Sequence, residues 1–304
     1  MSARRTSPPA RSRSDDRTVA FTFALPTAVL LLALTIYPFL QATLDSMFKL
    51  NLSTRTGPFV GADNYLVLAG SPDVHAALWR TLEWTVANVA VQTTLGLMIA
   101  LLLNAQLRGQ TVARALVLFP YMVPAIVVAL VFRFMFNDIT GIVNYLLVSS
   151  GLLRRPMAWL SSPDSALWAA VAVNCWKYTP FMVIVFLARL QTVPLELYDA
   201  ARIDGASVWA VFRYVTFPWL RPVLLIAMLL RTIWTANDFD LLYLLAFGGP
   251  LSSTTTIPLL IRSLAFGKQD IGMASALALG AGAFLCIAAV AYLRLYKRSE
   301  ASLQ

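Results

Sequence analysis

The sequence contains little charge. Only 13% of its 304 residues are Asp, Glu, Lys or Arg, whereas 59% are hydrophobic. A soluble domain carries about 25% charged residues, so the composition argues against a water-soluble globule. Little polar sequence separates the hydrophobic runs, which predicts one membrane domain and no sizeable soluble one. The expected fold class is therefore an all-α integral membrane protein.

Cysteine and histidine are also scarce, and this limits the chemistry that the chain can perform. The cysteines, Cys175 and Cys286, lie far apart in apolar runs, and His75 is the sole histidine. This spacing offers neither a disulfide framework nor a zinc site. The sequence also lacks the GxxxxGK[ST] loop that cradles nucleotide phosphates and the GxSxG nucleophile elbow. We therefore expect a chain that is not an enzyme and that holds no metal and no cofactor itself.

The charge that is present is mostly positive, with a net value of +9. In a soluble protein this balance would suggest a nucleic-acid partner. In a membrane protein, however, basic residues concentrate in cytoplasmic loops and orient the spans. We therefore expect contact with membrane lipid and no nucleic-acid partner.

Six apolar runs reach the length of about 20 residues that a helix needs to cross the hydrocarbon layer. They predict a six-span domain over 19–298, between a disordered basic tail at 1–18 and a short tail at 299–304. The predicted spans are 19–43, 80–104, 112–136, 165–190, 221–246 and 272–296. Lys and Arg are more frequent in the loops that share a side with the amino terminus. This bias predicts that both termini are cytoplasmic.

The predicted loop 191–220, between the fourth and fifth spans, contains the charged stretch ELYDAARIDGAS. Pro194 suits the first turn of a helix, and Asp199 complements the positive helix start. Gly205 can reverse the chain in a left-handed conformation. A second short helix is predicted to end at Pro218. Periodicity alone leaves two interpretations open, which are a hairpin resting on the membrane surface and a docking element for a cytoplasmic partner.

This loop resembles the EAA loop of ABC importer permeases. The resemblance is carried by Asp199-Ala200-Ala201, by Gly205, and by Val215-Thr216-Phe217-Pro218 at the family's spacing. The family pattern begins with Glu and ends near Ile-x-Leu-Pro, so Asp199, Val215 and Phe217 are departures from it. Gly141 to Asn144 is similar to the family's Gly-x-x-Asn, and Gly248-Gly249-Pro250 to the outer end of its following span. The ordered set resembles the sugar-type permeases of the maltose and glycerol-phosphate importer group.

The resemblance implies a six-span helical bundle of the type I ABC importer permease kind. Such a subunit translocates a carbohydrate, here a di- or oligosaccharide, a polyol or a glycerol phosphate, across the bacterial cytoplasmic (inner) membrane. It implies three kinds of partner: a second homologous permease, two cytoplasmic ATP-binding subunits that hold ATP and Mg, and an extracytoplasmic solute-binding protein. The residues implied in ATPase coupling are Glu196, Asp199, Ala200, Ala201, Asp204, Gly205 and Pro218.

Ionisable residues inside a span are costly and often functional. Arg231, Thr235 and Asp238 in the fifth predicted span are spaced i, i+4 and i+7, so they share one helix face. Aromatic rings, carboxylates and amides match the faces and hydroxyl groups of sugars. The candidate substrate pathway consists of Trp176, Lys177, Tyr178, Phe181, Arg231, Trp234, Thr235, Asn237 and Asp238.

Several alternatives remain open at this point. Arg231 and Asp238 could form an internal pair that only holds helices together, and Lys177 could pair with Asp238 or Asp240. The same charged residues could instead serve as the ion relay of a secondary transporter, although such a transporter needs no coupling loop. In the second predicted span, a polar stripe that includes Gln92 favours hydrogen bonds between helices over a pathway.

Overall fold

The computed structural model describes residues 13–105 and 109–301, and within these ranges the chain forms helices and no extended strand. The first half contains α1 (Arg13–Leu31), η1 (Leu32–Ile36), α2 (Tyr37–Asp45), α3 (Asp63–Ala69), α4 (Pro72–Asn104), α5 (Gln110–Met122), α6 (Ala125–Met135) and α7 (Ile142–Ser149). The second half contains α8 (Ala166–Leu190), α9 (Leu195–Ile203), α10 (Val208–Val211), η2 (Phe212–Thr216), α11 (Phe217–Ala236), α12 (Asp240–Ala246), α13 (Ile257–Arg262), η3 (Ser263–Gly267) and α14 (Ile271–Ala301). Five of these helical stretches are long and apolar enough to cross a membrane, or up to six if α5 and α6 form one span.

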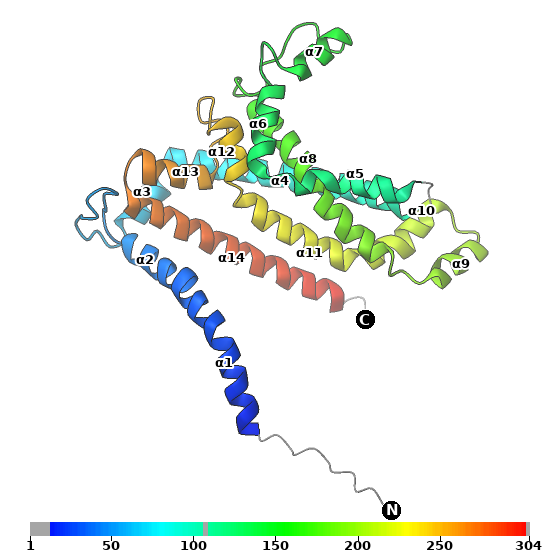
Figure 1. Cartoon of the computed structure of the whole chain (residues 1–304), viewed down its shortest axis with the longest axis horizontal. Helices are drawn as coiled ribbons and strands as arrows, with labels where there is room; N and C mark the ends of the chain where they lie inside the picture. The colour runs from blue at the N-terminus through cyan, green and yellow to red at the C-terminus, as the bar shows by residue number, and fades with distance from the viewer. Residues whose placement is uncertain (1–12, 106–108, 302–304) are drawn as a thin grey trace, which may run out of the picture.

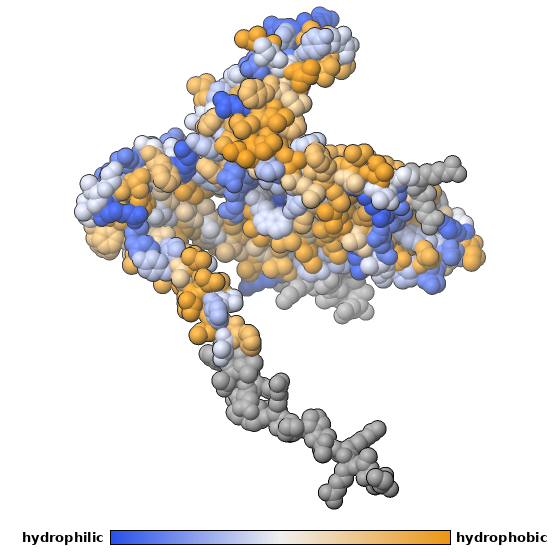
Figure 2. Space-filling view, in the orientation of Figure 1, coloured by the Kyte–Doolittle hydropathy of each residue, from blue (hydrophilic) through white to orange (hydrophobic). Residues whose placement is uncertain are grey.

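Long helices form the body of the molecule. α8 packs along α4, and α11 contacts α4, α8 and α14. α9 lies at one end of this bundle, the α9 end, whereas α3 and α13 lie at the opposite end, the α13 end (Figure 1). α1 diverges from the bundle, and α6 and α7 project from its side. Figure 2 shows hydrophobic residues over much of this face, with polar residues at both ends and in a patch near its centre.

α4 and α8 pack closely against each other at Gly96. A Cβ atom at Gly96 of α4 would lie 2.5 Å from the Cβ atom of Met182 on α8. The absence of a side chain at Gly96 lets the two backbones approach closely, as small residues do between helices in membranes. Buried apolar residues, among them Met182, Phe186 and Leu220, form a hydrophobic cluster that includes this contact.

The third predicted span, 112–136, is wrong as a single helix. The chain breaks between α5 and α6, whose axes are bent by 94°. Val123 lies at the break in an extended conformation, with ψ 130. Pro124 follows it, and a residue before proline is driven out of the helical region because it would clash with the proline ring. The sequence showed the prolines but predicted only a kink.

The fifth predicted span and the helix before it also differ from expectation. The span at 221–246 is two helices, because α11 ends at Ala236 and α12 begins at Asp240. The short helix predicted to end at Pro218 does not end there but runs through η2 into α11. The N–H of Phe217 bonds to the Phe212 carbonyl five residues back, and this widened turn accommodates the proline ring.

The predicted tails are shorter in the structure. α1 begins at Arg13, so residues 13–18 are helical rather than disordered, and residues 1–12 lie outside the described ranges. α14 continues to Ala301, which includes part of the tail predicted at 299–304. Both extensions have the same cause, since a helix already formed adds further residues at low cost.

The Gly-x-x-Asn segment, Gly141 to Asn144, fixes the projecting part of the chain that contains α7. The buried Asn144 amide donates to the carbonyls of Asp138 and Met157, at 3.1 and 2.9 Å. Its carbonyl oxygen accepts from the Met157 N–H and from Trp159 Nε1, at 3.0 and 2.9 Å. A Cβ atom at Gly141 would lie 2.3 Å from the Asn137 carbonyl oxygen, so only glycine fits there.

We predict that Gly96→Ala destabilises the bundle by about 1–3 kcal/mol, because the added methyl group must displace Met182. Thermal unfolding of the purified protein in detergent measures this effect. Gly280→Ala in α14 is the matched control, because a Cβ atom there would meet nothing within 4 Å. Equal melting temperatures for the two variants would contradict the close approach of α4 and α8.

Candidate functional site

A cavity of about 340 Å³, the inner cavity, opens between the two ends of the bundle. It forms where the carboxyl end of α5, the middle of α8 and the break between α11 and α12 meet. Its lining residues are Tyr121, Tyr178, Arg231, Trp234, Asn237, Asp238, Phe239 and Asp240. The cavity therefore combines aromatic rings, two carboxylates, an amide and a guanidinium, which can bind a polar solute on several sides.

A buried hydrogen-bond network fixes the charged groups of the inner cavity. Arg231, only 3% exposed, donates from Nε to Gln92 at 2.8 Å and from its terminal nitrogen to the Asn174 side-chain oxygen at 3.4 Å. Asn174 in turn donates to Asp238 at 2.7 Å and accepts from Gln92 at 2.9 Å. The Asn174 amide thus bridges Arg231 and Asp238, which replaces the direct pair considered from the sequence. The Gln92–Asn174 bond confirms that the polar stripe joins helices.

Lys177 does not pair with Asp238 or Asp240, as the sequence had suggested. It is 4% exposed, and its Nζ lies 2.5 Å from the carbonyl oxygen of Val123. That carbonyl lies at the break before Pro124, outside either helix. A backbone carbonyl buried in a membrane protein needs a donor, and Lys177 supplies it. Lys177 therefore stabilises the bend between α5 and α6 and does not line the inner cavity.

Five of the nine predicted pathway residues line the inner cavity and four do not. Lys177 and Thr235 are buried, and the Thr235 carbonyl accepts a hydrogen bond from Trp84 Nε1 at 3.0 Å. Phe181 packs edge to face on Trp234 at 5.1 Å, and Trp176 packs on a ring of α6. Successive residues of α8 point about 100° apart around the axis, so neighbours in sequence cannot all face one cavity. The lining residues missed were Tyr121, Phe239 and Asp240.

The helix α9 is exposed along its whole length and ends in a defined cap. No residue of α9 is buried. Gly205 follows it with φ +71, and the Ala206 N–H bonds to the Ala201 carbonyl at 2.9 Å. The Gly205 N–H bonds to the Arg202 carbonyl at 3.1 Å, which completes a Schellman motif and confirms the predicted left-handed glycine. A side chain at this φ would be strained.

Side-chain contacts tie α9 to the long helices. The hydroxyl groups of Tyr198 on α9 and Thr216 at the end of η2 lie 3.3 Å apart. Arg189 near the end of α8 donates to the Trp219 carbonyl on α11 at 3.0 Å, and Trp219 Nε1 donates to the Thr192 hydroxyl at 3.2 Å. α9 is therefore tied to η2, which continues into α11, while the end of α8 and the start of α11 are bonded to each other.

Exposed apolar side chains surround the exposed acidic group of α9. Leu195, Ile203, Val208 and Trp209 are all exposed at this end of the bundle. Asp199 pairs with Arg202 one turn later, at 3.2 Å, and both side chains face solvent. Large apolar side chains exposed close together in sequence beside charged ones are typical of a protein–protein interaction site.

The family described as binding-protein-dependent transport system inner membrane component matches residues 92–302, from the second half of α4 to the end of α14. The chain belongs to this family of permeases. The matched residues include α9 and every α8 and α11 residue of the buried network.

Individual relatives extend the similarity over nearly the whole chain. The trehalose/maltose transport system permease protein MalF of Thermococcus litoralis is 37% identical over 261 residues, covering 86% of this chain and 88% of that protein. The sulfoquinovosyl glycerol transport system permease protein SmoG of Agrobacterium fabrum is 33% identical over 287 residues, covering 94% of this chain and 92% of that protein.

A solved structure shares the fold of this permease. A chain of a bacterial ABC transporter involved in the import of the acidic polysaccharide alginate superposes with a TM-score of 0.82 at 20% identity. The match covers 93% of this chain and 96% of that chain. The present chain is therefore a multi-pass inner membrane permease subunit with the fold of the ABC transporter permeases.

We predict that stability effects at Asn174 and Asp238 of this permease are coupled. In a double-mutant cycle of Asn174→Ala with Asp238→Asn, the coupling should reach about 1–2 kcal/mol, because the first change removes the donor of this hydrogen bond and the second removes the acceptor charge that strengthens it. Lys177→Met with Asp238→Asn should give a smaller coupling, because Lys177 donates to Val123 instead. Unfolding of the purified variants in detergent measures both cycles. A larger coupling for Lys177 than for Asn174 would overturn the network described here.

Proposed function

We propose that this permease passes a carbohydrate across the membrane and that the inner cavity is its substrate site. The observation that carries the proposal is the grouping of Trp234, Asn237, Asp238 and Asp240 around one cavity beside a buried guanidinium. Carboxylate and amide groups exchange hydrogen bonds with hydroxyls, and an indole ring covers an apolar sugar face. The trehalose/maltose relative is named for transport of such a solute.

The charges of the inner cavity favour a neutral substrate over a phosphorylated one. Asp238 and Asp240 present two carboxylates, which repel an anion. Arg231 already donates to Gln92 and Asn174, so fewer of its N–H groups can bind an anion. Among the substrates considered from the sequence, a di- or oligosaccharide or a polyol therefore fits this cavity better than a glycerol phosphate.

The proposed energy source is a pair of cytoplasmic ATP-binding subunits that hold ATP and Mg and that dock on α9. Glu196, Asp199 and Asp204 give the exposed helix a negative face, and Ala200 and Ala201 let another chain approach closely. The Schellman cap at Gly205 and the contact of Tyr198 with Thr216, just before α11, make the helix a stiff connector. Movement of α9 would therefore displace the helices that frame the inner cavity. Pro218 lies in the first turn of α11, where a proline is tolerated, so the chain passes from η2 into α11 without a break.

The remaining proposed partners occupy other surfaces. Within the stretch Thr22–Asp45, an 18-residue window has a mean hydropathy of 2.0 and contains no buried residue, so we propose that a second homologous permease and lipid cover it. An extracytoplasmic solute-binding protein would dock at the α13 end. In this proposal, the α9 end and both termini lie in the cytoplasm.

The secondary-transporter alternative is not favoured. It required Lys177, Asp238 and Asp240 to form one relay, but Lys177 donates to a backbone carbonyl in the α5–α6 bend. Asp238 is hydrogen-bonded to Asn174. The family to which the chain belongs is described by dependence on a binding protein, which an ion-coupled transporter does not need.

We predict that Asn237→Leu lowers ATP-dependent sugar uptake about fivefold, because the cavity loses one polar contact to the sugar. Uptake by the reconstituted transporter measures this loss, with ATP hydrolysis recorded in parallel. Thr232→Val is the matched control, since Thr232 lies on the same helix, does not line the cavity and bonds to its own backbone at Met228. Equal uptake by both variants would remove Asn237 from the substrate site.

We predict that Asp199→Lys abolishes most coupling of ATP hydrolysis to transport, with uptake at least about tenfold lower, because like charges at an interface repel. Folding should change by no more than about 0.5 kcal/mol, since Asp199 is exposed. Asp164→Lys, before the opposite end of α8, is the control. Normal uptake and ATPase activity in Asp199→Lys would rule out docking through this face of α9.

A further inference from the structure

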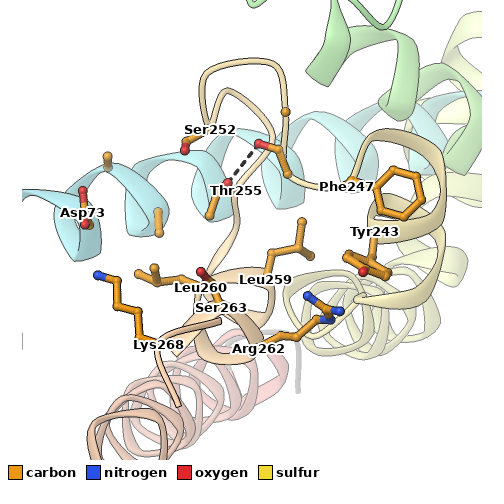
Figure 3. Close-up of a pocket in the computed structure, with 14 residues that line it drawn as sticks. Asp73, Tyr243, Phe247, Ser252, Thr255, Leu259, Leu260, Arg262, Ser263 and Lys268 are labelled. Carbon is orange, nitrogen blue, oxygen red and sulfur yellow. Dashed lines mark hydrogen bonds between the residues drawn. The ribbon is translucent and has the colours of Figure 1, made fainter. Parts of the chain in front are cut away.

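A second cavity, the outer pocket, lies at the α13 end and has no place in the function proposed so far. Its volume is about 410 Å³. Figure 3 shows Asp73 and Lys268 at one wall and Tyr243 and Arg262 at the opposite wall, with Ser263 between them. The start of α4, α12, the helix pair α13–η3 and the loop after α12 all contribute to it. Its volume falls within the range of about 300–1,000 Å³ that small-molecule sites occupy.

The charged groups of the outer pocket form no hydrogen bond or ion pair within the described part of the chain. Across residues 13–105 and 109–301, no hydrogen bond or ion pair engages the side chains of Asp73, Arg262 or Lys268. The Arg262 guanidinium lies 4.3 Å over the centre of the Tyr243 ring, so its direction is fixed while its N–H groups stay free. Uncommitted donors and acceptors on opposite walls suit a ligand that carries hydroxyl groups in several directions.

The loop that covers the outer pocket is held in place by its own hydrogen bonds. Thr255 donates from its hydroxyl to the Gly248 carbonyl at 3.0 Å, the bond drawn in Figure 3. Thr254 donates in the same way to the Gly249 carbonyl at 2.9 Å. The pocket wall is therefore formed before a ligand arrives, which reduces the entropy lost on binding.

One face of α12 connects the outer pocket with the inner cavity. Phe239, which lines the inner cavity, stacks on Tyr243 with ring centres 5.0 Å apart. Tyr243 meets Phe247 edge to face, also at 5.0 Å, and both line the outer pocket. These three residues, spaced four apart, form a continuous aromatic line. This line runs from a residue that lines the inner cavity to two residues that line the outer pocket.

We propose that the outer pocket is a second carbohydrate site, from which the sugar passes along the aromatic line of α12 to the inner cavity. The inference rests on the proposed function, because it adds a first binding position to the same transport path. Arg262, Lys268 and Asp73 hold the hydroxyl groups, and Tyr243 and Phe247 form the apolar wall. A side chain of the binding protein is the rival occupant, but a recessed pocket lined by hydroxyls and by charges of both signs fits a free sugar better.

The test uses the complete transporter in proteoliposomes, with its partner permease, ATP-binding subunits and binding protein. Radiolabelled trehalose, maltose, sorbitol and glycerol 3-phosphate are screened, and the compound with the highest ATP-dependent uptake serves as the probe. Arg262→Gln and Lys268→Gln should each lower the probe moved per ATP hydrolysed about fivefold, the effect of one lost polar contact. Tyr243→Leu should have a similar effect. Lys49→Gln, an exposed cation outside both cavities, is the matched control.

A second measurement separates the sugar from the rival occupant. The concentration of binding protein that half-maximally stimulates ATP hydrolysis should stay unchanged in Arg262→Gln and Lys268→Gln. If that concentration rises while the probe moved per ATP stays constant, the pocket is a protein contact and the inference is overturned. Unchanged values of both quantities overturn it as well, whereas loss of uptake by Asn237→Leu would still support the inner cavity. If wild type moves none of the four compounds, the proposed function itself fails.

Discussion

A backbone carbonyl inside a lipid bilayer has no water to bind, so each helix break must be satisfied by the protein itself. The permease breaks its helices at two places beside the inner cavity, and polar side chains supply donors there. Lys177 serves the Val123 carbonyl at the α5–α6 break. Trp84 serves the Thr235 carbonyl at the end of α11. These donors allow irregular backbone at the depth of the spans, and the irregular backbone makes room for the inner cavity.

The same helices that frame the inner cavity carry the exposed helix α9. α8 contributes Asn174 to the buried network and ends beside α9, while α11 contributes Arg231 and begins beside it. The Tyr198 hydroxyl bonds to that of Thr216, and Arg189 donates to the Trp219 carbonyl, so these ends are bonded together. A force on α9 therefore reaches the network through rigid helices. A conformational equilibrium shifts only as far as a partner binds its two states differently, and this geometry lets such a difference act on the cavity.

Polar and charged groups divide into two kinds in this permease. Gln92, Asn174 and Arg231, between α4, α8 and α11, are bonded to one another, so they fix helix positions. Those that line the outer pocket, Arg262 and Lys268 among them, are free to bind something else. Burying a charged group without partners is costly, so the first kind is satisfied within the protein and the second remains open to solvent.

The sequence by itself determined what depends on local patterns. Apolar run length predicted spans such as α8, whose bounds of Ala166–Leu190 lie within one residue of expectation, and the glycine at 205 predicted the left-handed turn after α9. Only the tertiary structure decided which polar residue meets which. From the sequence, Lys177 and Asp238 could have paired with each other. In the structure, Lys177 donates to the Val123 carbonyl at the α5–α6 bend, and Asp238 accepts from Asn174. Contacts between helices depend on how each helix is rotated about its axis and on where it breaks. Local sequence periodicity specifies neither.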